Sequence, residues 1–415
     1  MSKPIQNENP HHIEREFALD VVKKLVEKGH TALFAGGCVR DELLGLVPAD
    51  YDVASSASPD EVRKIFRRSL PVGVAFGVVD VLGPKVTGRT IHVQVATFRS
   101  DGAYIDGRHP EAVHFGSAEQ DAQRRDFTIN GIFCDPINDQ IIDFVGGRKD
   151  LDRRLLRAIG NASDRFREDR LRLLRAARLA ARFVLEVDPE TEEAIRNNAA
   201  GITLVSPERI ADELRRMLGH ATRARALSLL CQWELFQPIL PSITPPCTDT
   251  IEIINRLPPT AGFISVLALL LPHVQDAKRI GLELRLSNTE VRDIAWLVSQ
   301  KGWIAKAHTL SNHQLFPILE HSLFKTLLEI NRSQLGNGSE SEGLNRCQSI
   351  LKNPPLGGFS PPPFVNGSQL IQNGLKPGPA FTRVLEEVRN AQLDGLLTHQ
   401  EEALKMAVTI YHSLI

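Results

Sequence analysis

The chain changes character near residue 150, and this change limits the folds that it can adopt. Before it, short apolar runs with strand-like alternation, such as residues 90–99, are mixed with helical segments. After it, apolar residues recur at helical spacing in residues 168–183, 189–199 and 207–218, and strand signals nearly vanish. The sequence therefore predicts an α+β fold, in which a sheet-containing N-terminal unit is followed by a long helical region.

The bulk composition is that of an ordinary globular protein. Of the 415 residues, 42% are hydrophobic and 24% are charged, and the formal net charge is −1. Because the chain is nearly neutral, any contact with RNA must come from local basic patches. The five cysteines include no C-x-x-C pair, which favours free thiols in a reducing compartment over a disulfide framework or a zinc site.

Neither targeting nor membrane insertion is indicated by the sequence. The N-terminal residues MSKPIQNENPHH are polar and lack the apolar core of a signal peptide. The most apolar run, residues 263–271, is too short to cross a bilayer. We therefore expect a cytoplasmic protein without membrane contact, and no sequence feature indicates a protein partner.

Two aspartates one residue apart, Asp50 and Asp52, are the strongest candidates for catalytic residues. If Tyr51 lies in a strand, both carboxylates point to the same side, because side chains alternate along a strand. Two such carboxylates can hold Mg²⁺, which prefers oxygen ligands and keeps waters and substrate phosphates in its shell. A lone Asp-x-Asp is more often a solvated turn, so the pair needs further support.

That support comes from a glycine-arginine turn about ten residues upstream, which contains Gly36, Gly37, Arg40 and Asp41. The glycines let backbone amides approach a phosphate, and Arg40 can fork onto its oxygens. A phosphate-binding turn next to a metal-binding pair is suited to nucleotidyl transfer. The turn therefore favours the catalytic interpretation of the aspartates.

Further downstream, the segment RRDFTINGI (residues 124–132) places arginines and an aspartate before an apolar stretch. Arg125 can bind triphosphate oxygens, and Asp126 can order the site. Taken alone, the segment is more often explained by structural salt bridges. We keep both interpretations open for Arg125.

The richest helical pattern is DRFREDRLRLLRAARLAARF (residues 164–183). Its spacing of three predicts neighbours along one helical ridge for Asp169, Arg172, Arg175 and Arg178. A carboxylate beside a guanidinium matches the donor and acceptor edge of a nucleobase, and further arginines suit phosphates. The alternative is a salt-bridged amphipathic helix, braced by Glu208 or Arg209 from the next helix.

The motifs GGCVRD, DYD, VATFR, RRDFTING, EDRLRLLRAARLAAR and SPERIADEL occur in this order over about residues 30–218. Together they resemble the class II tRNA nucleotidyltransferase and bacterial poly(A) polymerase family of the polymerase β superfamily. A weaker C-terminal likeness covers residues 373–395. The resemblance implies a polymerase-β-like nucleotidyltransferase head followed by an all-helical neck, body and tail in a seahorse shape. The boundaries expected for these domains are 1–155 for the head, 156–225 for the nucleotide-selecting neck, 226–350 for the body and 351–415 for the tRNA-binding tail.

The resemblance also implies the reaction, which is template-independent addition of CCA to the 3′ end of tRNA from CTP and ATP with two Mg²⁺ ions. The expected catalytic and metal-binding residues are Asp50 and Asp52. The resemblance assigns triphosphate contacts to Gly37, Arg40 and Arg125. It assigns base reading to Asp169 and Arg172, with Arg175 and Arg178 completing the nucleotide pocket.

One residue departs from the resemblance. Many family members carry a glutamate directly before VATFR, where this chain has Gln94. As a neutral amide, Gln94 implies either weaker metal binding or a site in which two aspartates suffice, and we favour the second. The departure also leaves open a non-catalytic RNA-binding relative, although the intact aspartates argue against it.

Within the family, three features favour CCA addition. Residues 72–81 resemble the corresponding segment of CCA-type members, and the loop at residues 100–115 has the full length that CC-only members tend to shorten. The net charge is also near neutral. Poly(A) synthesis is the alternative, and addition of A alone also remains open. A nucleotidyltransferase acting on a small molecule or a protein is a further alternative. The long helical region, which is suited to cradling a folded RNA, disfavours it.

Overall fold

The structure is a computed structural model that describes residues 10–73, 77–86, 88–102, 113–335, 341–355 and 357–415. It divides into two compact units, one of Met1–Met217 with Arg225–Pro245 and one of Leu218–Ala224 with Pro246–Ile415. Within the described ranges, no helix is long and apolar enough to cross a membrane. The division of the chain into head, neck, body and tail remains a prediction.

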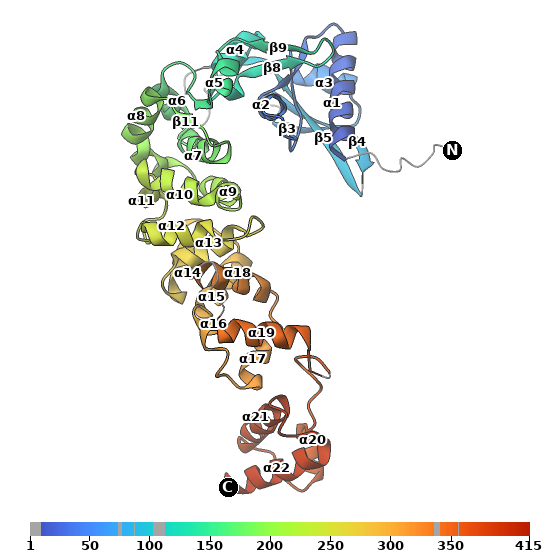
Figure 1. Cartoon of the computed structure of the whole chain (residues 1–415). Coiled ribbons are helices and arrows are strands. Elements are labelled where there is room, and N and C mark those ends of the chain that lie inside the picture. Colours follow the sequence, from blue (N-terminus) through green and yellow to red (C-terminus); the bar gives the residue numbers. More distant parts are fainter. Residues whose placement is uncertain (1–9, 74–76, 87, 103–112, 336–340, 356) are drawn as a thin grey trace, which may run out of the picture. The chain divides into compact units, whose positions relative to one another are not determined.

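The first unit contains a seven-stranded sheet with the strand order β3-β4-β5-β2-β1-β8-β9 (Figure 1). Its strands are β1 (Ala32–Ala35), β2 (Asp52–Ser55), β3 (Ser69–Gly73), β4 (Val78–Val86), β5 (Arg89–Thr97), β8 (Ile132–Asp135) and β9 (Gln140–Asp143). Neighbouring strands pair antiparallel, except that β2 and β5 are parallel. A separate two-stranded sheet joins β6 (Arg99–Asp101) to β7 (Val113–Phe115). Most of the loop expected between these two strands lies outside the described residues.

One face of the sheet is covered by helices. Along β5, buried and exposed side chains alternate, as expected from the sequence. On β5, Ile91, Val93 and Val95 are buried, whereas His92 and Gln94 are exposed. The helices α1 (Pro10–Glu27) and α3 (Pro59–Ile65) contact the sheet, and Ser58 caps the start of α3 in a capping box with Glu61. The polar residues of β5 therefore point to the opposite face.

That opposite face is covered at the β1 and β8 end by α4 (Ala118–Gln123). A cluster of Leu33, Ala35, Ala54, Phe98, Ala122 and Phe133 packs there. Asp52 shares this face with Ala54, because residues two apart on a strand point the same way. The apolar cluster therefore ends where the candidate catalytic residues begin.

The rest of the first unit is mainly helical, as predicted. Its helices are α2 (Gly37–Leu43), α5 (Gly147–Asp152), α6 (Ala162–Glu168), α7 (Arg172–Arg182), α8 (Pro189–Asn198), α9 (Pro207–Leu218), α10 (Arg223–Gln232) and α11 (Phe236–Ile239), with short 3₁₀ turns at Thr128–Asn130 and Ala199–Leu204. Two-residue strands, β10 (Leu155–Leu156) and β11 (Glu186–Val187), pair in parallel within this region. The α+β fold class predicted from the sequence is confirmed.

The expected continuous helix over residues 164–183 is instead two helices, α6 and α7. Asp169 has extended backbone angles (φ −140°, ψ 105°), and its carboxylate accepts the backbone N–H of Leu171 at 3.1 Å. An aspartate side chain that bonds the backbone two residues ahead competes with the helical hydrogen bonds. The prediction that Asp169 lies on the same helical ridge as the three arginines was therefore wrong.

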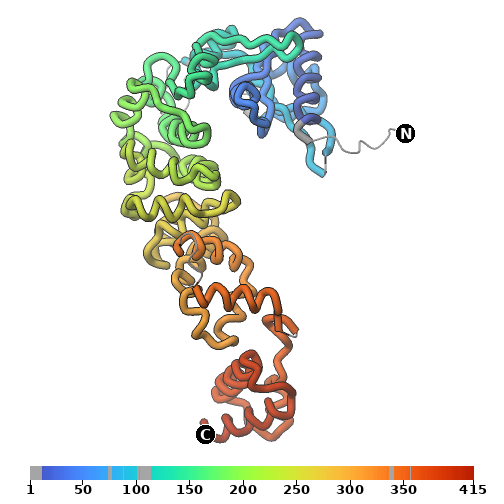
Figure 2. The backbone as a smooth tube through the Cα atoms, in the orientation of Figure 1, coloured from blue at the N-terminus to red at the C-terminus, as the bar shows by residue number. Residues whose placement is uncertain are grey.

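The second unit is helical throughout its described regular structure. Its helices are α12 (Thr248–Asn255), α13 (Phe263–Leu270), α14 (Val274–Glu283), α15 (Asn288–Ser299), α16 (Trp303–Lys306), α17 (Asn312–Leu319), α18 (Phe324–Leu335), α19 (Glu342–Lys352), α20 (Gly367–Gln372), α21 (Ala380–Leu393) and α22 (Gln400–Ser413). The last three helices lie together at the C-terminal end of the chain (Figure 2). They share a hydrophobic cluster that includes Leu370, Val384 and Tyr411. Buried Arg223 donates to five backbone carbonyls, those of Leu218, Leu257, Pro258, Pro259 and Ala261.

Candidate active site

The two candidate catalytic aspartates lie at the start of β2. The strand begins at Asp52, so the condition considered from the sequence, that Tyr51 lies in a strand, is not met. Tyr51 is instead buried, with its ring centroid 5.3 Å from that of Phe34 and its hydroxyl donating to Glu42 at 2.9 Å. Its anchored side chain fixes the chain between Asp50 and Asp52.

The environment of the pair disfavours two negative charges. Burial and the charge of Asp50 together raise the pKa of Asp52 to about 6, although Arg125 opposes them. Asp50 is exposed and Asp52 is partly buried. A carboxylate pair whose like charges oppose each other fits a divalent cation, because the cation would neutralise both.

Gln94 lies beside this pair, as expected from the sequence. In the parallel pairing of β2 with β5, Asp52 and Gln94 are direct register partners. Among the described residues, no three His, Cys, Asp or Glu side chains are close enough to hold a metal ion together. In the described part of the chain, the candidate metal site therefore has two acidic ligands, Asp50 and Asp52, and no third one beside them.

Arg125 lies between α4 and the glycine turn. It donates to Asp121 at 2.9 and 3.1 Å and to the carbonyl of Asn130 at 3.1 Å, and its guanidinium carbon lies 4.8 Å from the ring centroid of Phe133. Gly36 has φ +71°, and a Cβ atom there would lie 2.7 Å from Nη1 of Arg125. Glycine at position 36 therefore permits the close approach of this guanidinium to the turn.

Arg40 is more deeply placed than the sequence suggested. It is 7% exposed, donates to Asp41 Oδ1 at 2.6 and 2.8 Å and to the side-chain oxygen of Asn130, and stacks 4.4 Å from the ring centroid of Phe183. Burial lowers the pKa of Arg40, and Asp41 opposes this effect. Gly37, the first residue of α2, lies next to it. The expected contacts of Arg40 and Gly37 with a triphosphate remain predictions.

Asp169 and Arg172 are held by different partners. Arg209, one of the two bracing residues considered from the sequence, donates to both oxygens of Asp169, at 3.0 and 3.2 Å. Arg172 donates to Glu168 at 2.8 Å and to the carbonyls of Arg165 and Arg124 at 3.1 and 3.0 Å. Each side chain is thus fixed in orientation, and the assignment of base reading to them remains a prediction.

Arg175 and Arg178, further along α7, both bind buried carboxylates. Arg175 contacts Asp126 at 2.6 Å, and Arg178 contacts Glu213 of α9 at 2.6 Å. Arg175 and a hydrogen bond from Asn130 hold the pKa of buried Asp126 well below its usual range, although burial opposes them. These pairs join α7 to the segment between α4 and the 3₁₀ turn Thr128–Asn130, and to α9.

Comparison with known proteins identifies the family. Residues 32–157 match the model of the poly A polymerase head domain, and residues 185–246 match a probable RNA and SrmB-binding site of polymerase A. The CCA-adding enzyme of Geobacillus stearothermophilus is 34% identical over 393 residues, covering 93% of this chain and 95% of that protein. That of Lactobacillus johnsonii is 31% identical over 402 residues, covering 95% and 97%. The chain belongs to the family of CCA-adding enzymes and bacterial poly(A) polymerases.

Solved structures agree with this family assignment. The crystal structure of the Bacillus stearothermophilus CCA-adding enzyme in complex with CTP matches with a TM-score of 0.80 at 28% identity, covering 98% of this chain and 99% of that one.

A poly(A)-synthesising relative matches in sequence over a shorter range. Poly(A) polymerase I of Escherichia coli O157:H7 is 40% identical over 241 residues, which cover 55% of this chain and 50% of that protein. The likeness to CCA-adding enzymes thus extends over nearly the whole chain.

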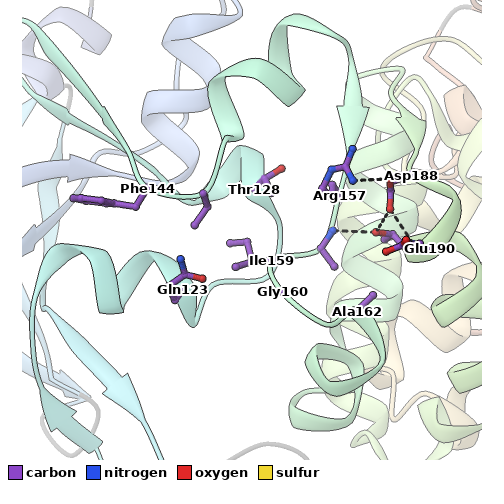
Figure 3. Close-up of a pocket in the computed structure, with 12 residues that line it drawn as sticks. Gln123, Thr128, Phe144, Arg157, Ile159, Gly160, Ala162, Asp188 and Glu190 are labelled. Carbon is purple, nitrogen blue, oxygen red and sulfur yellow. Dashed lines mark hydrogen bonds and ion pairs between the residues drawn. The ribbon is translucent and has the colours of Figure 1, made fainter.

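Two cavities in the first unit of this family member differ in their surroundings. One of about 340 Å³ lies between the segment 123–145 and α8 (Figure 3). Two of its charged lining residues pair with each other, since Arg157 contacts Asp188 at 2.8 Å. The other, of about 370 Å³, is lined by Arg124, Arg165 and Glu168, which also bind Arg172. The second cavity therefore adjoins the predicted base-reading residue.

Sequence reasoning missed one residue that organises the site. Asp121 is 1% exposed and binds both Arg124 and Arg125, at 2.6 and 2.9 Å. The signal was present in AEQDAQRRD, because an acid three and four residues before two arginines faces both on a helix. The partner of Arg178, Glu213, carried no comparable local signal, because 35 residues separate the two.

Proposed function

We propose that this protein adds CCA to the 3′ end of tRNA, using CTP and ATP without a nucleic-acid template. The observation that carries the proposal is the pair of Asp50 and Asp52 beside Arg125, at the parallel junction of β2 and β5. Similarity over nearly the whole chain supports CCA addition over poly(A) synthesis. The CCA-adding enzymes of Geobacillus stearothermophilus and Lactobacillus johnsonii match over 93% and 95% of this chain. The poly(A) polymerase of Escherichia coli O157:H7 matches over 55%, as does, over 54%, the CCA-adding enzyme of Bacillus subtilis.

Asp50 and Asp52 would hold two Mg²⁺ ions, since paired carboxylate oxygens are the ligands that Mg²⁺ prefers. Bound there, the ions would act as Lewis acids on the phosphoryl oxygens and lower the pKa of the primer 3′-hydroxyl. Asp52 contributes only when ionised, which the nearby charge of Arg125 favours. Arg125 would also face the triphosphate, and Gly36 leaves the space for it beside the turn.

The remaining nucleotide contacts divide into direct and supporting roles. Asp169 and Arg172 would read the base, because a carboxylate and a guanidinium fixed by other partners keep their hydrogen-bonding edges aligned. Their fixing partners are Arg209 and Glu168. Arg175 and Arg178 would complete the pocket mainly by holding α7 in place. Arg40 would do the same for the turn that begins at Gly37.

The tRNA would contact the helical part of the chain, including the proposed tail at residues 351–415, where α20, α21 and α22 share one apolar cluster. We infer a cytoplasmic location from this substrate. The proposed domain division places the nucleotide-selecting helices in a neck of residues 156–225, followed by a body of residues 226–350.

A primer-extension assay tests this function. Three tRNAs, ending before CCA, after C and after CC, are incubated with Mg²⁺ and with CTP, ATP or both. We expect addition of C, C and A to the shortest tRNA, followed by arrest. A long ladder of A on any RNA would instead identify a poly(A) polymerase, and extension of only the CC end would identify an A-adding enzyme. No incorporation at all would support a non-catalytic relative.

A further inference from the structure

A buried acid that the proposed reaction does not use lies on the same sheet face as Asp52. Asp80 on β4 is the register partner of Gln94 on β5, and Gln94 is in turn the register partner of Asp52 on β2. Register partners on neighbouring strands point to the same face. Asp52, Gln94 and Asp80 therefore form a row across three strands, with the amide in the middle.

One carboxylate oxygen of Asp80 has a hydrogen-bond partner, and the other has none in the part of the chain that the structure describes. It is 8% exposed, and its Oδ2 lies 2.8 Å from Nδ1 of His92. Its Oδ1 is buried and has no hydrogen-bond partner among the described residues. A buried carboxylate oxygen without a donor is unfavourable, so a nearby N–H group that can reach it gains a hydrogen bond at little cost.

Gln94 is the neighbour that carries such a donor. Its side chain is exposed, and an amide offers N–H groups on one side and an acceptor oxygen on the other. Opposite side chains of paired strands have Cβ atoms about 5 Å apart, which a glutamine bridges easily. If the amide N–H group turned instead to Asp52, it would compete with a cation for that carboxylate.

We propose that Asp80 is a positioning residue that accepts an N–H of Gln94 and so directs the amide oxygen toward the cation site of Asp50 and Asp52. This rests on the proposed function, because it assigns that site a third, neutral oxygen ligand. His92 fixes the carboxylate of Asp80 by holding Oδ2, which leaves Oδ1 for the amide. Partners that orient a metal ligand typically change metal affinity about 10- to 100-fold when removed.

The test uses the full-length protein and Mn²⁺ as the probe, because bound Mn²⁺ is measured by electron paramagnetic resonance without any turnover. Asp80→Leu removes the acceptor, and we expect about 10-fold weaker Mn²⁺ binding and a similar rise in the Mg²⁺ concentration for half-maximal nucleotide addition. Asp80→Asn keeps a carbonyl acceptor and should stay within about threefold of the parent protein. Asp60→Leu, an exposed acid on α3, is the control and should bind Mn²⁺ normally.

A second variant separates positioning from a purely structural role. Gln94→Glu should restore Mn²⁺ binding in the Asp80→Leu background, because a carboxylate has no amide to orient. Gln94→Ala should weaken binding as much as Asp80→Leu, and the double variant should be no worse, since both act on one ligand. Unchanged Mn²⁺ binding in Asp80→Leu overturns the proposal, as does a loss that Gln94→Glu does not rescue.

The outcomes also distinguish this proposal from the proposed function. If the parent protein incorporates no nucleotide but the variants still differ in Mn²⁺ binding as expected, the function is wrong and the positioning role stands. If the parent protein adds CCA and every variant binds Mn²⁺ equally, the positioning role is wrong and the function stands.

Discussion

Charged side chains are arranged in opposite ways on the sheet face that carries Asp52 and on the arginine-rich helix α7: like charges are neighbours on the first, and opposite charges are paired on the second. On the sheet face, burial and the charge of Asp50 together raise the pKa of Asp52 to about 6. On α7, every arginine assigned to the site has a carboxylate partner. The pairs are Arg172 with Glu168, Arg175 with Asp126, and Arg178 with Glu213.

This difference indicates that the sheet face serves catalysis, whereas α7 mainly stabilises the fold around the site. Like charges held together destabilise a fold, and they persist where a cation or substrate is bound. Buried opposite charges fix geometry, and removing one partner leaves the other charge uncompensated. The sheet face is therefore expected to lose activity and gain stability when its charge is removed, whereas α7 is expected to lose stability first.

The largest effect is expected at Asp52. Asp52→Asn keeps the shape of the side chain but removes a metal ligand, so nucleotide addition should fall by about 10⁴-fold for both CTP and ATP. Because the folded-state pKa is raised, the charged carboxylate destabilises the fold above pH 6, and the free energy of unfolding at pH 7 should rise by about 1–2 kcal/mol in the variant.

Both quantities are measurable on one preparation, by single-turnover addition with Mg²⁺ and by urea unfolding in EDTA. A variant that loses stability together with activity would give Asp52 a structural role and remove the contrast with α7. Binding of tRNA should be nearly unchanged, because the substitution alters no helical surface.

The next effect tests the paired region. Arg178→Ala leaves Glu213, which is 3% exposed, without its close partner and should lower the free energy of unfolding by about 3–5 kcal/mol. The matched control is Arg216→Ala, which removes a contact with the same carboxylate at 3.9 Å from an arginine that is 67% exposed. We expect less than about 1 kcal/mol for this control. Equal losses in urea unfolding would show that burial does not set the strength of these pairs.

Asp126 should give a smaller effect that depends on pH. Arg175 is 36% exposed, so screening reduces the value of its pair, and Asp126→Asn should lower the free energy of unfolding by about 2 kcal/mol at pH 7. Because the folded-state pKa of Asp126 is lowered, its charge stabilises the fold above the ordinary aspartate pKa and loses that effect as the pH falls further. The difference between parent and variant should therefore shrink below about pH 4. A difference that is constant from pH 7 to pH 3 would contradict the charged pair.

The elements of this fold were predictable where the signal was local. The strand Arg89–Thr97 and the helices Pro189–Asn198 and Pro207–Leu218 lie where the sequence placed them. Each depends on apolar spacing or on a cap within a few residues. The break at Asp169 was missed because its side-chain bond to Leu171 competes with an otherwise strong helical pattern.

Partners distant in the sequence were not predictable in the same way. The candidate residues were recognisable from motif order, but the row of Asp52, Gln94 and Asp80 depends on strand register, which the sheet as a whole sets. The pairing of Arg175 with Asp126 likewise joins residues 49 apart in the chain. A motif thus names the residue types of a site, while the fold decides which charges are compensated.

The smallest effect is expected at Gly36, where the glycine turn lies against Arg125. Gly36→Ala combines a positive φ of +71° with a Cβ atom 2.7 Å from Nη1 of Arg125, so the guanidinium must shift. We expect a loss of about 1–2 kcal/mol in unfolding free energy and a several-fold rise in KM for CTP, with little change in kcat.

Gly45→Ala is the matched control, because φ there is +69° but its Cβ would meet nothing within 4 Å. It should lose similar stability without the change in KM, since it carries the backbone strain but does not displace Arg125. If both variants raise KM equally, backbone strain and not the position of Arg125 controls nucleotide binding.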